Sequence, residues 1–472
     1  MTDNSSVRRQ ELVSRLRDYL GDLSEDSHAT LARSIDRAKA RGETSPVHSI
    51  IMDALRNVAQ EGDRALPRFP SAERAFFIPI EPIILPVQLP EKQAARIDRA
   101  SLHPIWVWIT RDLAPGRCDS HLAALRAAVA DEDEAAIHDC AEDLRVVVRR
   151  EAKVVIEKTE RQSGSLQKLE GQLGSKRILA DLHDAIAFLD QRDVVEAFLD
   201  QMPDKLPVGQ KGLNIITEAL KVYDDHPDAD PIYGFSSIVG RVGSPSDLVR
   251  FAVWLAKSSD PARIRPTSGS SAVQIALSEA MLEVQRLREQ LAGPRDLETS
   301  LACLRRYHET VSTIARTLDE VATDPWLKRL AHIRVHASEM LTKEFDPLIH
   351  LIKRVVGVVE SRGRQITPDA ASIEEAVFGT SLFITARDAR GSLALNALID
   401  RVEKGIDDAL ENQGKSAIDR LATTDEENWD AAFARSKAAA ELFQVYHGGV
   451  YGASMARRHA SLADGRPLAE TG

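Results

Sequence analysis

Three apolar repeats between residues 272 and 343 constrain the fold of this chain more than any other feature. In the first repeat the apolar residues are separated by alternating steps of four and three, and they are Val273, Leu277, Ala280, Val284, Leu287 and Leu291. This spacing places the side chains along one face of an α-helix, in the heptad pattern of helices that pack side by side. A second repeat runs from Leu297 to Val321 and a third from Leu327 to Met340. The pattern predicts three long helices.

The connections between these three helices are short. Gly293-Pro294 separates the first helix from the second, and Asp324-Pro325 separates the second from the third. Short connections favour antiparallel neighbours within one chain. We therefore expect a long antiparallel three-helix section with coiled-coil-like packing. An intermolecular coiled coil is the alternative.

The rest of the chain also has a helical pattern. A capping residue followed by proline, which marks a helix start, recurs at Asp230-Pro231, Ser244-Pro245, Asp260-Pro261, Asp324-Pro325, Asp346-Pro347 and Thr367-Pro368. Apolar periodicity predicts helices near 119–130, 132–160, 176–190, 193–201 and 210–223. Strand signals are scarce. The sequence thus predicts an all-α fold, either a multi-helix bundle or an irregular helical array.

Breaks in the periodicity divide the chain into seven segments. At 472 residues the chain is longer than one hydrophobic core usually organises, so several domains or one elongated array are expected. The segments are an N-terminal helical segment at 1–66, an extended apolar proline-rich strap at 67–92, a helical domain at 93–225, short helices and loops at 226–265, the long antiparallel bundle at 266–364, a C-terminal helical segment at 365–460 and a disordered tail at 461–472.

The segment FFIPIEPIILPVQLP, residues 76–90, departs from the helical pattern. Nine of its 15 residues are aliphatic or aromatic and four are proline. Proline lacks a backbone donor and biases the residue before it toward extended geometry. We therefore expect an extended strap here, neither a helix nor a central strand.

Three roles for this strap follow from its composition. Burial in a groove between helices is favoured, because an exposed run of this kind promotes aggregation and because aromatic residues gather between positions 69 and 108. Contact with lipid and docking of a partner protein are the alternatives. If the strap docks a partner, the residues expected to contact it are Phe76, Phe77, Ile80, Ile83, Ile84 and Leu85.

Three histidines form the one arrangement that could bind a metal. His332 and His336 lie one turn apart on the third long helix, and His308 lies on the second. Positions 308 and 336 are each 14 residues from a turn centred near residue 322, so an antiparallel pair would place them level. Three imidazoles could hold zinc with one open position. The heptad pattern instead makes His308 a core residue, and we expect no cofactor.

Other motifs of chemistry are incomplete. GQLGSKR, residues 171–177, lacks the spacing of a phosphate-binding loop and follows a helix. DDHPDADP, residues 224–231, lacks the residue order of a calcium loop. The sequence contains no Gly-x-Ser-x-Gly elbow. Enzymatic activity has no positive support from these patterns.

Charge and composition restrict the partners and the location. The net charge of −11 and the shortness of the basic clusters argue against binding to nucleic acid. The three cysteines are scattered, which does not fit a disulfide framework. The N-terminus lacks an apolar signal region, and the chain lacks a transmembrane segment of 18 or more apolar residues. We expect a cytoplasmic protein.

Glycines near the C-terminus indicate close helix packing. We expect one last helix near 425–459, in which Gly448, Gly452 and Ala456 lie four apart on one face. Small residues at this spacing let another backbone approach closely. A hinge at Gly448 and Gly449 is the alternative, because adjacent glycines weaken a helix.

These observations favour a non-enzymatic helical scaffold or regulatory adaptor that acts by protein–protein interaction. Its partner is an unidentified protein, and the chain could also form a homo-oligomer. The alternative is an α-helical metalloprotein, or an enzyme that binds a small molecule, with a site built from His308, His332 and His336.

Overall fold

A computed structural model describes residues 71–161, 164–293, 295–321, 323–361 and 364–464, together with Leu31, Ser34, Ile35 and Ile51. Its chain divides into unit 1, which comprises Met1–Phe198 and His226–Ala229, and unit 2, which comprises Leu199–Asp225 and Asp230–Gly472. Most of the helical segment expected at 1–66 and most of the tail expected at 461–472 lie outside the described residues.

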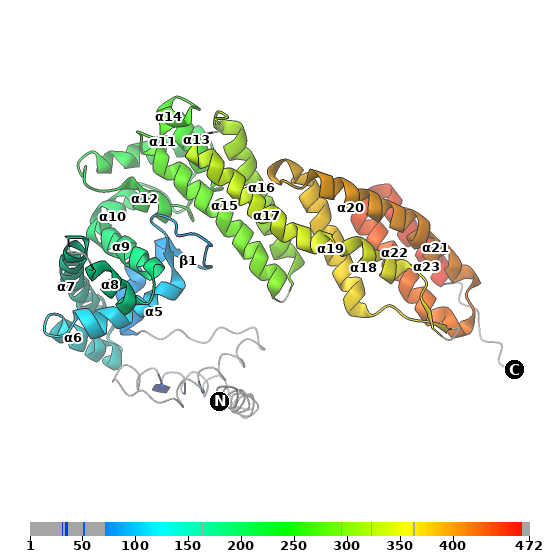
Figure 1. Ribbon diagram of the computed structural model, residues 1–472, viewed down its shortest axis with the longest axis horizontal. Helices are drawn as coiled ribbons and strands as arrows, with labels where there is room; N and C mark the ends of the chain where they lie inside the picture. The colour runs from blue at the N-terminus through cyan, green and yellow to red at the C-terminus, as the bar shows by residue number, and fades with distance from the viewer. Residues whose placement is uncertain are drawn as a thin grey trace. The chain divides into compact units, whose positions relative to one another are not determined.

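Unit 1 is built around one long helix, α7, which packs against α4, α6, α8 and α9 (Figure 1). Its described elements are α4 (Ala72–Phe77), the 3₁₀ helix η1 (Ile78–Ile83), β1 (Ile84–Leu85), β2 (Ile97–Asp98), α5 (Arg99–Trp108), the π-helical turn η2 (Ile109–Leu113), α6 (Asp119–Asp131), α7 (Glu134–Arg161), α8 (Ser165–Leu173), α9 (Lys176–Asp190) and α10 (Arg192–Asp200).

An aromatic cluster forms part of the core of unit 1. The ring centroid of Phe76 lies 5.0 Å from that of Phe77 and 5.7 Å from that of Trp106. All three side chains are buried. Edge-on and tilted ring contacts of this kind add to the stability that apolar burial provides. The core expected from the aromatic residues between 69 and 108 is therefore present.

The proline-rich segment is extended only in its second half. Helix α4 ends at Phe77, and Ile78–Ile83 forms the 3₁₀ helix η1 with Pro79 in its first turn. The expectation of no helix here was wrong, because proline fits the first turn of a helix, whose amides have no partner within the helix, and because a short 3₁₀ helix needs few backbone bonds. Extended geometry begins at Ile84, and β1 pairs in parallel with β2 through Ile84↔Ile97 and Leu85↔Asp98.

Unit 2 contains the remaining helices. They are α11 (Gln210–Leu220), η3 (Lys221–Tyr223), α12 (Pro231–Ser237), α13 (Ser246–Ala256), α14 (Pro261–Ile264), α15 (Gly269–Ala292), α16 (Leu297–Thr317), α17 (Pro325–Phe345), α18 (Leu348–Val356), α19 (Ala370–Asp388), η4 (Arg390–Ser392), α20 (Asn396–Ala409), η5 (Leu410–Gly414), α21 (Lys415–Arg420), η6 (Leu421–Thr423), η7 (Glu426–Asn428), α22 (Trp429–His447) and α23 (Gly449–Ala463). The short strand β3 (Glu360–Ser361) pairs in an antiparallel arrangement with β4 (Arg364–Gln365). The prediction of an all-α fold is confirmed for the described residues.

The three predicted long helices are α15, α16 and α17, and α15 packs against both of the others (Figure 1). Every residue from Ile275 to Val284 is buried, including Glu279 and Glu283. The cause is that α12 and α13 also contact α15, so the helix is enclosed on several sides. The predicted heptad face is buried from Val273 to Leu287, and Leu291 is half-buried. However, α15 is the central helix of a bundle and has no single two-helix seam.

Helix starts follow the Asp-Pro pattern at three of the predicted positions. The side chains of Asp230, Asp260 and Asp324 cap α12, α14 and α17 by accepting hydrogen bonds from the amides two residues on. At Thr367-Pro368 the helix starts later, and Asp369 caps α19 instead. A carboxylate outcompetes a hydroxyl for the exposed amides, because the helix N-terminus also attracts negative charge.

The C-terminal helix predicted at 425–459 consists of two helices. Gly448 and Gly449 have φ angles of 57° and 47°, a region that favours glycine, and they form a tight turn between α22 and α23. A Cβ atom added to Gly452 would lie 2.7 Å from the Cα atom of Gln444. The close approach expected from the glycine spacing therefore exists at Gly452, and the neighbouring backbone belongs to the preceding helix.

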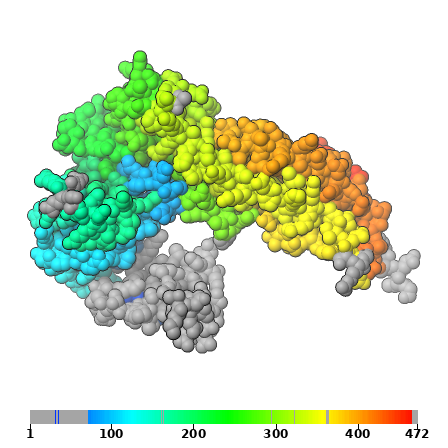
Figure 2. Space-filling view, viewed as in Figure 1, coloured from blue at the N-terminus to red at the C-terminus, as the bar shows by residue number. Residues whose placement is uncertain are grey.

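The helices of the C-terminal half of unit 2 pack against one another. Helix α18 contacts α19, α20 and α22, and the yellow and orange surfaces of this region meet in Figure 2. None of the helices within the described ranges combines the length and the hydropathy needed to cross a bilayer.

Candidate functional site

All six residues predicted to contact a partner lie in the core of unit 1. Phe76, Phe77, Ile80, Ile83, Ile84 and Leu85 are buried, as the burial hypothesis for this segment expects. In residues 76–90 the large apolar side chain that stays exposed is Ile78, at 58%. Ile78 differs from its neighbours because it is the first residue of η1, on the side that faces a cleft.

The Ile78 cleft has a volume of about 430 Å³, which is within the usual range for a binding site. Three segments line it. They are Arg74, Ala75, Ile78 and Pro79 from α4 and η1; Glu134, Ile137, His138, Ala141 and Arg145 from α7; and Arg192 and Glu196 from α10. Its apolar part comes from Ile78, Pro79, Ile137 and Ala141, and charged side chains surround that part.

Arg145 fixes one wall of the cleft. Its side chain is buried and donates from Nη1 to the carbonyl oxygen of Ala75 over 2.9 Å. It also donates from Nη2 to Glu142 over 2.8 Å. Burial lowers the pKa of Arg145, and the carboxylate of Glu142 opposes that effect. Arg145 thus ties α7 to the end of α4.

Glu142 links two arginines of the cleft. Besides Arg145, it accepts a hydrogen bond of 2.5 Å from Nη1 of Arg192, which also pairs with Glu196 over 2.6 Å. Burial raises the pKa of Glu142, but the hydrogen bonds and charges of the two arginines outweigh it and lower that pKa below its ordinary value. The charged side chains of Arg145, Glu142 and Arg192 are therefore paired with one another within unit 1.

Two charged side chains at the edge of the cleft have no such partner. Arg74 and Glu134 are both exposed, and no ion pair with another described residue involves either of them. Charged groups of opposite sign at the edge of an apolar cleft can orient a bound ligand.

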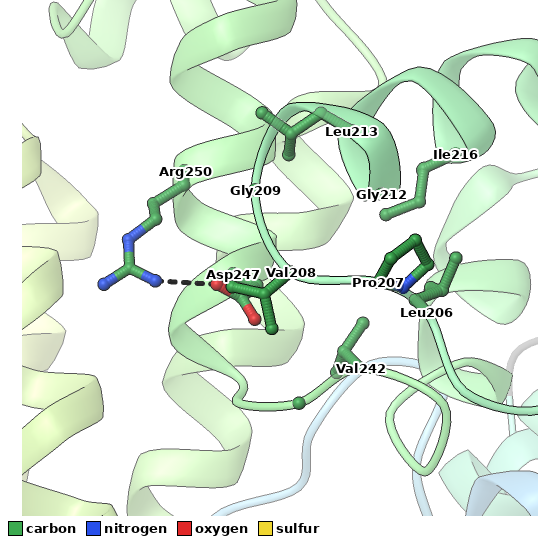
Figure 3. A pocket seen from close by; sticks show the side chains of 11 residues that line it. Leu206, Pro207, Val208, Gly209, Gly212, Leu213, Ile216, Val242, Asp247 and Arg250 are labelled. Carbon is green, nitrogen blue, oxygen red and sulfur yellow. Dashed lines mark hydrogen bonds and ion pairs between the residues drawn. The ribbon is translucent and has the colours of Figure 1, made fainter.

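A smaller apolar pocket, the Val208 socket, lies in unit 2 and has a volume of about 90 Å³. It is lined by Leu206, Pro207, Val208, Gly209, Gly212, Leu213, Ile216, Val242, Gly243, Asp247 and Arg250 (Figure 3). Figure 3 shows Arg250 extended away from the apolar side chains and joined to Asp247, with 2.7 Å between Nη1 and Oδ1. The loop of residues 206–209 packs tightly on α11, since a Cβ atom on Gly212 of that helix would lie 2.1 Å from the carbonyl oxygen of Pro207.

The three histidines proposed as metal ligands do not form a cluster. His308 faces η4, where its Nδ1 atom lies 2.9 Å from the Oγ atom of Ser392. Burial lowers the pKa of His308. The rings of His332 and His336 lie 4.5 Å apart on α17. Helices α16 and α17 both pack on α15, and the described residues contain no group of three or more His, Cys, Asp or Glu placed to hold a metal ion.

Sequence reasoning missed a cluster of buried charges in unit 1. Lys92 pairs with Asp181 over 2.8 Å, the amide of Asp98 donates to Asp181 over 3.2 Å, and Arg177 pairs with Asp98. Burial raises the pKa of Asp181, although Lys92 lowers it. In the sequence, Asp181 at a core position of α9 is the local sign of this cluster. These contacts hold the loop between β1 and β2 against α9.

The remaining motifs have structural roles. Gly174 ends α8 with a φ angle of 101°, and the side chain of Ser175 caps α9, so GQLGSKR is a connection between helices. The basic residues Lys153 and Arg149 pair with Asp190, and Arg306 pairs with Glu283.

Comparisons of the chain with protein-family models, with curated proteins and with solved structures found no match.

Proposed function

We propose that this protein is a cytoplasmic helical adaptor that binds an amphipathic helix of a partner protein in the Ile78 cleft. The observation that carries the proposal is the 58% exposure of Ile78 at the edge of a cleft of about 430 Å³. The other large apolar side chains of α4 and η1 are buried, so Ile78 is the one left without intramolecular cover. An aliphatic side chain at the edge of an apolar cleft is typical of a helix-in-groove interface.

The cleft also indicates the chemistry of the helix that fits it. Its apolar part would accept one aliphatic or aromatic anchor, which is how most binding energy is concentrated at protein interfaces. Arg74 and Glu134 flank this part on different helices. The helix is therefore expected to carry an acidic residue on one side of its anchor, for Arg74, and a basic residue on the other, for Glu134.

The walls of the cleft are held in place before a partner binds. Arg145, Glu142 and Arg192 connect the end of α4, α7 and α10 through hydrogen bonds of 2.5 to 2.9 Å. A site that is already ordered loses less conformational entropy on binding. This rigidity supports a docking role for the cleft more than a role in catalysis, which would need a reactive group that the three linked charges do not supply.

Selection from a phage-displayed library of helical peptides tests the proposal. The full-length protein is the bait, and the Ile78→Asp variant serves for counter-selection. We expect enriched peptides to share an apolar anchor flanked by one acidic and one basic residue. Failure of the wild type to enrich any peptide over Ile78→Asp contradicts the proposal.

Native mass spectrometry of the purified protein separates this function from binding of a small molecule. A peptide-binding cleft predicts the mass of the chain alone. A co-purifying small molecule that Ile78→Asp releases would assign the cleft to that molecule and overturn the adaptor proposal.

A further inference from the structure

Helix α23 is attached to unit 2 through little buried apolar surface. It packs against α22, α21 and η6 (Figure 1). Between Gly449 and Ala463, the buried residues are Gly452 and Met455. Regions with few buried apolar contacts open locally at a lower free energy than the whole protein unfolds. Helix α23 can therefore separate from its neighbours while the rest of unit 2 stays folded.

The turn before α23 has the backbone freedom of a hinge. Gly448 has φ and ψ angles of 57° and −158°, and Gly449 has a φ angle of 47°. Glycine adopts these conformations and many others at little steric cost. Hinges are a few residues at element ends that absorb a change of backbone angles. Rotation at Gly448 and Gly449 would move α23 as a unit.

Polar side-chain contacts hold α23 against the helices around it. They include Tyr451 with Glu411 over 2.6 Å, Arg458 with Asp419 over 2.7 Å and His459 with Ser436 over 2.8 Å. Histidine is the side chain whose charge ordinarily changes between about pH 5 and 8. The contact of His459 is therefore the one that a modest acidification can alter.

His459 lies half-buried between α23 and α22. Its Nδ1 atom lies beside the Oγ atom of Ser436, which is fully buried, and its ring centroid is 5.3 Å from that of Phe433. A neutral ring can accept the hydroxyl proton of Ser436 at Nδ1, whereas a protonated ring cannot. Burial lowers the pKa of His459, and the positive charge of Lys437 lowers that pKa further.

The charged side chains around His459 do not offset this effect. Asp419 is paired with Arg458, and Arg435 donates to the carbonyl oxygen of Gly357. Lys437 is the charged group that acts on the imidazole. Helix η6 carries no ionisable side chain. The charged residues of the elements that meet near His459 are Asp430, Arg435 and Lys437 on α22, Asp419 and Arg420 on α21, and Arg457, Arg458 and Asp464 on or next to α23.

We propose that α23 detaches from α22 in mild acid, with Gly448 and Gly449 as the hinge and protonation of His459 as the trigger. Opening uncovers an apolar cluster of Leu421, Trp429 and Ala432, which Leu462 and Ala463 cover when α23 is in place. The C-terminal half of unit 2 thus carries a surface that is hidden at neutral pH and exposed in acid. This device does not involve the Ile78 cleft.

The direction of the pH dependence follows from the neutral form of His459. Its pKa is lower when α23 is packed than its ordinary value of 6.5, so the neutral ring stabilises the closed helix. This contribution is fully present above pH 6.5 and is lost as the pH falls through the lower, folded-state pKa. One proton allows the opening equilibrium to rise by at most about tenfold per pH unit within that window.

Hydrogen exchange measured by mass spectrometry on the full-length protein tests the proposal. Exchange rates are corrected for the intrinsic effect of pH, which leaves the opening equilibrium of each segment. We expect opening of α23 to increase severalfold between about pH 7.5 and about pH 5.5. Peptides from α15 serve as the internal reference and should keep their protection over the same range.

Three variants assign the effect to His459. His459→Gln can still contact Ser436 but does not titrate in this range, so the pH dependence of α23 should disappear. Lys437→Gln removes the nearby positive charge and should make the dependence smaller. His350→Gln changes an exposed histidine of α18 and should behave like the wild type. Circular dichroism checks that each variant folds.

Several results would overturn the proposal. They are an opening equilibrium of wild-type α23 that does not change with pH, a His459→Gln variant that keeps the full dependence, and equal loss of protection in α15, which would indicate global unfolding. Ile78→Asp should keep the wild-type dependence, so failure of this device is distinguishable from failure of the adaptor function.

Discussion

The Nη1 atom of Arg145 lies 2.9 Å from the carbonyl oxygen of Ala75, so a buried guanidinium on α7 holds the end of α4 in place. The same side chain contacts the carbonyl oxygen of Phe76 over 3.3 Å. These oxygens belong to the last turn of α4, four and three residues before Pro79, the first proline of η1. The proline-rich segment therefore starts from a position that α7 fixes, and this places Ile78 at the cleft.

Replacing Arg145 should destabilise unit 1. In Arg145→Met the carbonyl oxygens of α4 lose their donor, and Glu142 loses one of its two arginines. Leaving buried polar groups without partners predicts a loss of about 2–4 kcal/mol in the free energy of unfolding. Chemical denaturation measures it. The control Arg150→Met removes an exposed arginine of the same helix, which pairs with Glu151 among the described residues, and should change stability by less than about 0.5 kcal/mol.

Aspartate at two positions of η1 should have opposite consequences. Ile83 is buried, so Ile83→Asp places a charge in the core and should cost about 4 kcal/mol or more. Ile78→Asp adds an exposed charge and should leave the thermal midpoint within the range of ordinary surface variants. Thermal melts distinguish the two. Equal destabilisation by both changes would contradict the burial pattern on which the cleft depends.

Acid should weaken the contacts of Glu142. Its pKa is lower in the folded protein than its ordinary value of 4.5, so the ionised form stabilises the fold. This contribution is fully present above pH 4.5 and is lost as the pH falls through the lower, folded-state pKa. Denaturation at a series of pH values should therefore show that the stability difference between the wild type and Glu142→Gln shrinks in acid. A difference that grows in acid would reverse the assigned sign.

Two helical glycines should respond to alanine in opposite directions. Gly452→Ala places a Cβ atom 2.7 Å from the backbone of α22, and we expect a loss of about 1–3 kcal/mol from overpacking. Gly171 lies within α8 with nothing within 4 Å of a Cβ atom, so Gly171→Ala should gain about 0.5–1 kcal/mol from helix propensity. Chemical denaturation measures both. A stabilising Gly452→Ala would show that the close approach is absent.

Local patterns sufficed to predict many helices. Helix α9 has the predicted bounds of 176–190, because Ser175 caps its first turn and the apolar period continues to its end. Helices α6 and α7 begin and end within two residues of the predicted bounds. Capping and periodicity involve residues a few positions apart, so the sequence contains them directly.

Other features depend on contacts between distant segments. The Ile78 cleft combines side chains from residues 74–79, 134–145 and 192–196, and no local pattern links Glu142 to Arg192. Burial of α15 on several sides depends on where α12 and α13 pack. The predicted histidine site assumed that α16 and α17 pack as a simple pair, whereas both helices pack on α15. Pro79 was read as a break, although its position in the first turn makes it compatible with η1.

The most direct test of the adaptor function is the affinity of a selected helical peptide for the full-length protein, measured by fluorescence anisotropy. We expect Ile78→Asp to weaken binding by about tenfold or more, which corresponds to at least about 1.4 kcal/mol. Val154→Asp changes an exposed valine of α7 outside the cleft lining and should bind like the wild type. Binding of the peptide to Ile78→Asp with wild-type affinity would contradict the account.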